Sequence, residues 1–576
     1  MDRKGSRNQA ARASRQKKRN FRGNQHTSEQ DSTFASTSAE KLSTSRNIDF
    51  PVSKECGYCI INFFSVFATI ASLVICKDCK KKIEFSPTSH RGLGFKICVS
   101  CSCKETYIDS SPLIDKAFEI NRRIVLVFRL LGVGLEGLNL FCGLMDICQG
   151  MATNTYYACL ENIYVASSAI YNCILQQAVE EEKEKNKNAG NIETHLTVSG
   201  DGTWKKRGFS SLFGVSTLIG KYSNKVIDAV NKSSFCQACN LWNNKKNENI
   251  EDYEDWYATH KESCSINHIG SAGKMEVDAI TEMFARSKQK YGVMYTNYIG
   301  DGDSKTFRGI LNINPYENEV TITKKECVGH VQKRMGTRLR NAKKNHKGLG
   351  GKGVGKLTDK IISELSTYYG LAIRRHPNST EEMKKEIWAT YFHKSSTDEK
   401  PQHQNCPAGT DSWCKWRKAE AESTLENFHH DNPPLGDNVL EVIKPIYEKL
   451  SSDELLERCL GAETQNNNES LNSLIWTFAP KHLYSGPKII EISTFLAVTI
   501  FNEGFMPILK ILNVMGIKVG HHAETYATLR NRHRINRAEQ RLAEFEKRIH
   551  RREEKLMLNS FYEQEEGYLY GPGIAD

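Results

Sequence analysis

Between residues 194 and 344 the sequence alternates strand and helix patterns in a restrictive order. Alternating apolar and polar residues predict strands over residues 194–204 and 211–220, and a third short run covers 225–230. Apolar residues at helical spacing then predict a helix over 274–291. A strand at 293–301, a short helix at 305–312, a strand within 319–330 and a basic helix at 330–344 complete the pattern.

Three strands followed by helix, strand, helix and strand is the order of the ribonuclease H-like fold. We therefore predict an α/β protein with a mixed sheet of this kind, a large and mainly helical insertion, small zinc-binding modules and a C-terminal helix. In that fold the first and fourth strands are neighbours. Asp201 of GDGTW and Asp301 of YIGDGDS should therefore meet, although they are far apart in the chain.

Three acidic residues recur where a strand or helix meets polar residues. Asp201 lies on the first predicted strand, Asp301 lies at the end of the fourth, and Glu469 of NNNES lies near the start of a predicted helix that would face the sheet. Asp303 competes with Asp301, because the spacing does not decide which aspartate of DGD points inward.

Carboxylates in this number suit a pair of hard cations. Mg²⁺, or Mn²⁺ in its place, binds carboxylate oxygen, and two such ions activate the attacking oxygen and stabilise the leaving oxygen of a phosphodiester. We assign Asp201 as the bridging ligand, with Asp301 and Glu469 as the flanking ligands.

The motifs GDGTW, GDGDSK, CVGH and TQNNNESLNS resemble those of the Mutator-like transposases of eukaryotic cut-and-paste elements, over roughly residues 50–520. The resemblance implies an Asp-Asp-Glu triad on a ribonuclease H-like fold and double-stranded DNA as the substrate. It also implies a Cys-x-x-His pair near the active site, here Cys327 and His330. The implied reaction is hydrolysis at element ends, followed by attack of the freed 3′-hydroxyl on target DNA.

Two other functions remain open. A ribonuclease H-like nuclease without strand transfer would need the same metal site. A non-catalytic, zinc-stabilised DNA-binding protein derived from a transposase would keep the fold without the chemistry.

The 18 cysteines favour metal sites, because no secretion signal is visible and close Cys pairs are typical zinc ligands. We predict a zinc-ribbon site, with Cys103 as a substitute for Cys101 and with Cys56 and Cys59 just upstream. We predict a second zinc site in the insertion after the third strand, with His268 as a spare ligand. A third predicted site lies in a loop that has little apolar core of its own. The predicted sets are Cys76, Cys79, Cys98 and Cys101; Cys236, Cys239, His260 and Cys264; and His393, His403, Cys406 and Cys414.

The charge distribution suggests an anionic partner. The net charge is +11, and the basic helix carries the DNA-contact candidates Lys333, Arg334, Arg338 and Arg340, whose spread favours phosphate contacts over base reading. A basic run at residues 12–22 suggests nuclear import or a phosphate-binding arm. No membrane span is predicted, since the most apolar run, residues 60–75, is short and interrupted by polar residues.

The chain divides into predicted regions at shifts in composition. Ile535, Leu542, Ile549 and Leu556 recur at heptad spacing, which is typical either of a short coiled coil, and so of a homodimer or higher oligomer, or of a helix that packs on its own domain. The regions are a disordered basic tail (1–45), a zinc-ribbon-like module (46–110), a helical region (111–190), the sheet core (191–335) with a zinc insertion at 231–270, an insertion domain (336–455), core completion (456–520) and a charged C-terminal helix and tail (521–576).

Overall fold

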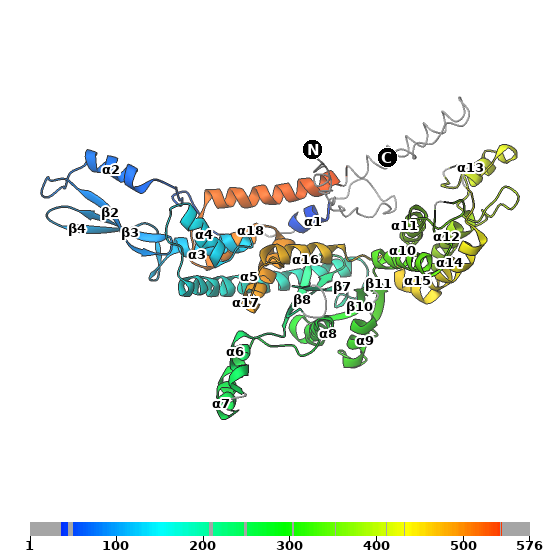
Figure 1. Cartoon of the computed structure of the whole chain (residues 1–576), viewed down its shortest axis with the longest axis horizontal. Coiled ribbons are helices and arrows are strands. Elements are labelled where there is room, and N and C mark those ends of the chain that lie inside the picture. The colour runs from blue at the N-terminus through cyan, green and yellow to red at the C-terminus, as the bar shows by residue number, and fades with distance from the viewer. Residues whose placement is uncertain are drawn as a thin grey trace, which may run out of the picture.

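The computed structural model describes residues 36–43, 50–206, 211–246, 250–301, 304–351, 353–410, 412–430, 433–541 and 543. It shows an elongated mixed α/β molecule with a cysteine-rich sheet at one end, a central five-stranded sheet and a helical lobe at the other end (Figure 1). The predicted basic run at 12–22 and most of the heptad pattern, including Leu542, Ile549 and Leu556, lie outside the described residues.

The central sheet has the strand order β11-β10-β7-β8-β9. The first three strands in sequence pair antiparallel, whereas β10 lies parallel to both β7 and β11. The prediction that the first and fourth strands are neighbours is therefore confirmed. The strands are β7 (His195–Trp204), β8 (Phe213–Gly220), β9 (Val226–Ser233), β10 (Met294–Gly300) and β11 (Thr323–Glu326).

Helices cover both faces of this sheet, so β8, an interior strand between β7 and β9, is buried along its whole length. On one face α8 (Ala272–Tyr291) packs with α9 (Ser304–Ile313), and their apolar side chains join those of β7 and β10. On the other face α5 (Thr153–Asn188), α16 (Asn466–Phe478) and α17 (Pro487–Glu503) lie against β7, β8 and β9.

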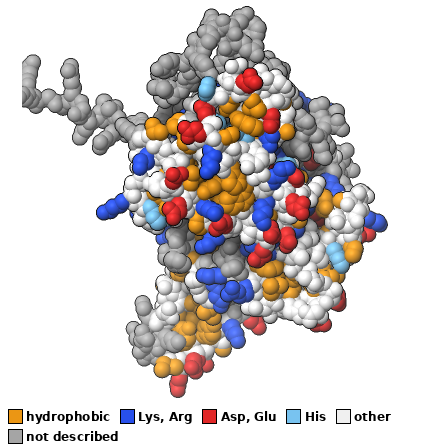
Figure 2. Space-filling model, turned by 90° about the vertical axis from the view of Figure 1, so that its right-hand side faces the viewer, with side chains coloured by type: hydrophobic (Ala, Val, Ile, Leu, Met, Phe, Trp, Pro, Cys, Tyr) orange, Lys and Arg blue, Asp and Glu red, His pale blue; other side chains and the backbone are white. Residues whose placement is uncertain are grey.

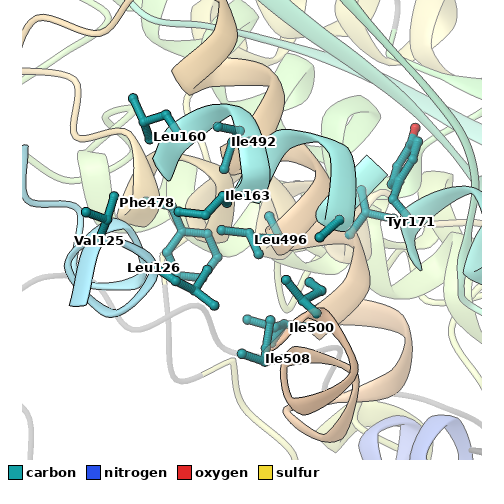
Figure 3. Packing of buried hydrophobic residues seen from close by; sticks show 14 of the residues in the cluster. Val125, Leu126, Leu160, Ile163, Tyr171, Phe478, Ile492, Leu496, Ile500 and Ile508 are labelled. Carbon is teal, nitrogen blue, oxygen red and sulfur yellow. The ribbon is translucent and has the colours of Figure 1, made fainter. Parts of the chain in front are cut away.

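The face of the sheet covered by α5, α16 and α17 contains the largest apolar core among the described residues. Val125 and Leu126 of α3 (Glu119–Leu130) meet Ile163 of α5, Leu496 of α17 and Ile508 of α18 (Met506–Val514) in one cluster (Figure 3). Residues far apart in the chain thus close around α16, and this packing fixes α16 against the sheet. The short α4 (Leu135–Leu144) also contributes to this cluster.

The lobe after β11 has its own apolar core, which begins with Val328 at the start of α10 and extends to Cys459. The helix α10 thus leaves the sheet and enters the insertion directly. The helices of this lobe are α10 (Val328–Asn345), α11 (Asp359–Arg375), α12 (Thr380–His393), α13 (Lys415–Ala421), α14 (Asp437–Leu450) and α15 (Asp453–Cys459), with η2 (Leu425–Asn427).

The remaining elements form the cysteine-rich end, a projecting arm and short pairings. The arm, α6 and α7, extends away from the central sheet between β9 and α8 (Figure 1). A further helix covers residues 521–541. The elements are α1 (Thr37–Ser43), β1 (Val52–Ser53), α2 (Phe63–Leu73), β2 (Glu84–Arg91), β3 (Gly94–Ser100), β4 (Glu105–Asp109), β5 (Leu113–Ile114), β6 (Ala117–Phe118), α6 (Gln237–Lys246), α7 (Ile250–His260), η1 (Lys261–Ser263) and β12 (Val519–Gly520).

Within the described residues, no single helix has both the length and the apolar composition needed to cross a bilayer. One sharply bent pair, Glu119–Leu130 with Leu135–Leu144, meets these criteria of length and composition when its two helices are taken together.

Candidate active site

Two of the predicted acids lie at matching positions on neighbouring parallel strands. The register of β7 and β10 pairs Ser199 with Ile299, so Asp201 and Asp301 each follow two residues later. On the other side of β10, the Cys327 N–H donates to the Gly300 carbonyl at 3.3 Å. The structure therefore brings Asp201, Asp301 and Cys327 to one edge of the sheet. Asp303, the rival of Asp301, lies outside the described residues.

The glycines around Asp201 let the opposite face of β7 pack closely. A Cβ added at Gly200 would lie 2.5 Å from the Tyr298 ring, and one added at Gly202 would lie 2.7 Å from a Glu276 carboxylate oxygen. Because side chains alternate along a strand, Asp201 points to the face that α16 covers. The GDG motif thus combines close packing on one face with a carboxylate on the other.

A row of three polar contacts joins α16 to that face of β7. Ser199 Oγ donates to Asn468 Oδ1 at 2.8 Å, and Trp476 Nε1 donates to Thr203 Oγ1 at 2.8 Å. Between them, Asn472 Nδ2 donates to Asp201 Oδ2 at 2.7 Å. Two strand residues advance about 6.6 Å and four helix residues about 6 Å, so the two spacings match closely enough for each contact to form.

Gln465, just before α16, ties the Cys-x-x-His pair to β7. Its Nε2 donates to the Gly200 carbonyl at 2.6 Å, and its Oε1 lies 3.0 Å from His330 Nδ1. The hydrogen bond with Cys327 raises the pKa of His330 despite burial. Burial alone would raise the pKa of the Cys327 thiol, but the hydrogen bond and charge of His330 outweigh it and lower that pKa.

Glu469 lies between Gln465, which contacts His330, and Asn472, which contacts Asp201 of β7. It is four residues after Gln465 and three before Asn472, so all three share one helix face. The Glu469 side chain is 49% exposed, and one of its oxygens lies 3.6 Å from Lys333 Nζ. The helix therefore holds Glu469 in a half-exposed position, where Lys333 of α10 supplies a cation beside it.

The electrostatics of the site suit a bound cation. Burial raises the pKa of Asp201 to about 6, and the charge of Asp301 adds to the effect, whereas His330, the Gly202 amide and Asn472 oppose it. Asn472 Oδ1 is buried and has no hydrogen-bond partner among the described residues. Two neighbouring carboxylates beside an unsatisfied oxygen form a donor set of the kind that hard divalent cations bind, so the residues present fit Mg²⁺ or Mn²⁺.

The predicted DNA-contact residues of α10 separate into two groups. Arg338 and Arg340 are exposed, and Lys333 is exposed beside Glu469. Arg334 instead contacts the buried carboxylate of Glu326 at 2.6 Å, which it shares with Lys324 and Arg458. On the end of the molecule formed by the helical lobe, basic, acidic and apolar side chains are interspersed (Figure 2).

The first cysteine cluster differs from the predicted set at one position. Cys76, Cys79, Cys101 and Cys103 converge, with Sγ–Sγ distances from 3.0 to 3.9 Å. A tetrahedral Zn²⁺ with Zn–S bonds of about 2.3 Å separates two sulfurs by roughly 3.8 Å. Cys98 is excluded because it lies inside β3, and three residues of strand span about 10 Å. Cys103 therefore takes the place of Cys98, not that of Cys101.

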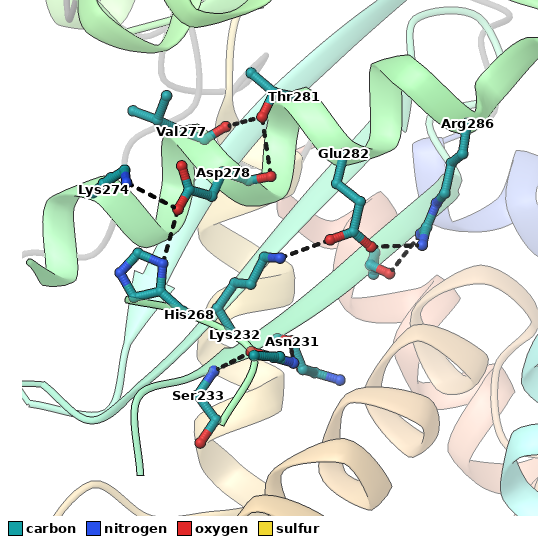
Figure 4. Close-up of polar contacts among 12 residues, drawn as sticks. Asn231, Lys232, Ser233, His268, Lys274, Val277, Asp278, Thr281, Glu282 and Arg286 are labelled. Carbon is teal, nitrogen blue, oxygen red and sulfur yellow. Dashed lines mark hydrogen bonds and ion pairs between the residues drawn. The ribbon is translucent and has the colours of Figure 1, made fainter. Parts of the chain in front are cut away.

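The second cluster has the predicted members. Cys236 Sγ lies 3.3 Å from His260 Nε2, and Cys239 Sγ lies 3.5 Å from Cys264 Sγ. His268 was expected as a spare ligand, but it is engaged elsewhere. Its Nδ1 lies 3.0 Å from Asp278 on α8, next to the ion pairs that join α8 to β9 (Figure 4).

The third cluster also brings its predicted members together, namely His393, His403, Cys406 and Cys414. Of the upstream pair, Cys56 lies apart from these clusters and contacts the Lys518 carbonyl.

Sequence reasoning missed the amide side chains of the site. Gln465, Asn468 and Asn472 recur at spacings of three and four in TQNNNESLN, which places them on one helix face. That periodicity was the available signal, but amides carry no charge and their role depends on the strand beside them.

A family model described as Mutator-like transposase matches residues 57–414. The match includes Asp201, Asp301, Cys327 and His330 and ends before Glu469. No match was found among curated proteins or among solved structures.

Proposed function

We propose that this chain, which belongs to the Mutator-like transposase family, is a DNA transposase that cleaves and joins DNA phosphodiesters at Asp201, Asp301 and Glu469. The observation that carries the proposal is the convergence of three chain segments. Two parallel strands bring Asp201 and Asp301 to one sheet edge, and α16 lies against Asp201 through Asn472 while carrying Glu469 one turn away.

In this proposal Asp201, Asp301 and Glu469 would together hold two Mg²⁺ or Mn²⁺ ions. The ions would supply activation of the attacking oxygen and stabilisation of the leaving oxygen. The protein's own part is positioning: Asn472 orients the Asp201 carboxylate, and Gln465 fixes His330 against β7.

The strand order supports a ribonuclease H-like core. Three antiparallel strands followed by two parallel ones, in the order β11-β10-β7-β8-β9, place the first and fourth strands side by side. That adjacency is what the proposed pairing of Asp201 with Asp301 requires.

The protein would bind double-stranded DNA in the nucleus, with Arg338 and Arg340 contacting phosphates. The clusters at Cys76 and Cys236 would hold structural Zn²⁺. Four protein ligands at tetrahedral separations leave no open position for catalysis by the metal.

A cleavage and joining assay tests the proposal. The substrate is a duplex carrying the sequences that flank this gene, incubated with full-length protein and Mg²⁺ or Mn²⁺. We expect metal-dependent cleavage and joining of the new 3′ end to a second duplex. Asp201→Asn and Glu469→Gln should abolish both, while Glu276→Gln, a change on the opposite face of β7, should preserve them.

The outcomes separate the competing functions. Cleavage without joining would identify a nuclease that lacks strand transfer. DNA binding with no cleavage in either metal would identify a non-catalytic binding protein. Cleavage that persists in the Asp201→Asn variant would rule out the proposed site.

A further inference from the structure

The third cluster carries a network of contacts that extends beyond its four members. It lies between the end of α12 and the start of α14, in a segment whose described residues form α13 and η2 as their only regular elements. The apolar core there is small: Ala389, Cys406 and Cys414, with Trp413 and Trp416 packed against them. So little apolar burial does not by itself order a segment of this length.

The ligand atoms of this cluster have the separations of a tetrahedral zinc site. With Zn–N near 2.0 Å and Zn–S near 2.3 Å, such a site has N–N edges of roughly 3.3 Å and N–S edges of roughly 3.5 Å. His393 Nδ1 and His403 Nδ1 lie 3.2 Å apart. The four N–S distances to Cys406 and Cys414 are 3.9, 3.8, 3.6 and 3.4 Å.

The second nitrogen of His403 continues into a hydrogen-bonded relay. His403 Nε2 lies 2.9 Å from His430 Nε2, and His430 Nδ1 lies 2.5 Å from Asp398 Oδ1. The Asp398 oxygen also accepts from the His430 backbone N–H at 2.8 Å. Asp398 thus holds His430, and His430 contacts the one ring nitrogen of His403 that faces away from the cluster.

The relay has one consistent arrangement of protons. If His403 Nδ1 offers its lone pair to a metal, its Nε2 carries the proton and donates to His430 Nε2. His430 then carries its own proton on Nδ1 and donates it to the Asp398 carboxylate. A carboxylate that orients a metal-binding histidine in this way raises the basicity of the ligand and fixes its tautomer.

We propose that His393, His403, Cys406 and Cys414 form a Zn²⁺ site whose outer shell is the relay of His430 and Asp398. Asp398 and His430 are positioning residues, since neither touches the metal. The site joins the end of α12 to the segment that precedes α14, so bound metal would order this segment of the helical lobe.

Zinc content and zinc release in the full-length protein test the proposal. Cys414→Ser should lower the zinc content by one ion per chain. Asp398→Asn and His430→Phe should keep that ion but bind it about 10- to 100-fold more weakly, as measured by competition with a chromogenic chelator. The matched control is His429→Gln, because His429 also contacts Asp398, at 3.2 Å, but lies outside the relay.

Each result decides one part of the proposal. An unchanged zinc content in Cys414→Ser would overturn the site. Affinities equal to that of His429→Gln in both relay variants would overturn the outer shell. If Cys414→Ser is insoluble, Cys406→His is used instead. Co²⁺ bound to this variant should show a visible spectrum shifted from that of the Co²⁺-bound wild type. An identical spectrum would overturn the site. None of these readouts depends on DNA cleavage.

Discussion

At Gly200 one added methyl group would occupy space that the Tyr298 ring already fills. The nearest ring atom would be 2.5 Å away, and Leu218 would be 3.1 Å away on the same face. We expect Gly200→Ala to lower the free energy of unfolding by about 1–3 kcal/mol, because overpacking forces the ring or the strand to move. Urea denaturation followed by circular dichroism measures the change.

A second glycine gives the matched control. Gly273 lies in α8, and a Cβ added there meets nothing within 4 Å. Gly273→Ala should therefore be neutral or stabilising by up to about 1 kcal/mol, as alanine favours helix. Equal effects of the two substitutions would show that close packing against Tyr298 does not constrain the GDG motif.

Single residues were predictable where their chemistry is local. The positions of Asp201 on the first strand and of Asp301 directly after the fourth were predictable, because each carboxylate lies in or beside a strand pattern that is visible in the sequence. Whether Cys98 or Cys103 is the fourth ligand of the first cysteine cluster was not predictable, because the answer depends on where β3 ends. A residue inside a strand is about 10 Å from one three positions later, whereas residues in a turn fold back on each other.

At the scale of elements, the positions of the strands along the chain followed from the alternation patterns, but the contact of α16 with β7 did not. Periodicity places Asn468 and Asn472 on one helix face. It does not show which strand that face meets, because the partner lies more than 260 residues away in the chain. The core that α16 shares with α5 and α17 holds the helix where the Ser199–Asn468 and Asp201–Asn472 contacts form.

The helix α10 yields a prediction that separates binding from stability. Replacing Arg338 and Arg340 by alanine should weaken DNA binding and reduce the slope of log K against log salt by about 1.8, if each contacts one phosphate. The unfolding free energy should change little, since both side chains are exposed. Fluorescence anisotropy across a salt series provides the slope.

Arg334→Ala is the contrasting variant. It should leave the salt slope unchanged and lower the unfolding free energy by about 1.5–3 kcal/mol, because Glu326 is buried and loses a charged hydrogen bond. A reduced slope in Arg334→Ala, or an unchanged one in the double variant, would contradict this division.

A buried cluster of two ion pairs joins α5 and α17 to the residue just before β9, and it predicts how stability depends on pH. Lys225 is 1% exposed and contacts Glu503 at 2.7 Å and Glu181 at 2.8 Å. Burial alone would raise the pKa of Glu181, but Lys225 and Lys185 outweigh it and lower that pKa below its ordinary value of 4.5. A depressed carboxyl pKa stabilises the fold above the unfolded value, and this contribution is lost as pH falls below about 4.5.

Glu181→Gln isolates that contribution. The variant should be less stable than the wild type at pH 6, and the difference should shrink as the pH approaches 3.5. Urea midpoints at several pH values give both curves. A difference that stays constant over this range would exclude ionised Glu181 as its source.

The whole molecule distributes its apolar cores unevenly along its length. The central sheet and the helical lobe each have a large buried cluster, whereas α2 has no fully buried residue and every residue of β4 is exposed. This arrangement was only partly predictable. The cysteine spacing indicated a metal module, but nothing in the sequence showed that the lobe's core begins inside α10.

This uneven distribution predicts what happens when zinc is removed from the cysteine-rich end. Cys76→Ser or Cys103→Ser should release one zinc ion and make residues 56–110 sensitive to protease, because the module has little apolar burial to order it without the metal. The region around Asp201 should stay protected, since its own core is intact. Zinc analysis and mass spectrometry of the fragments follow both effects. Cys98→Ser is the matched control: it should keep the metal and the protection, and zinc loss in this variant would restore Cys98 as a ligand.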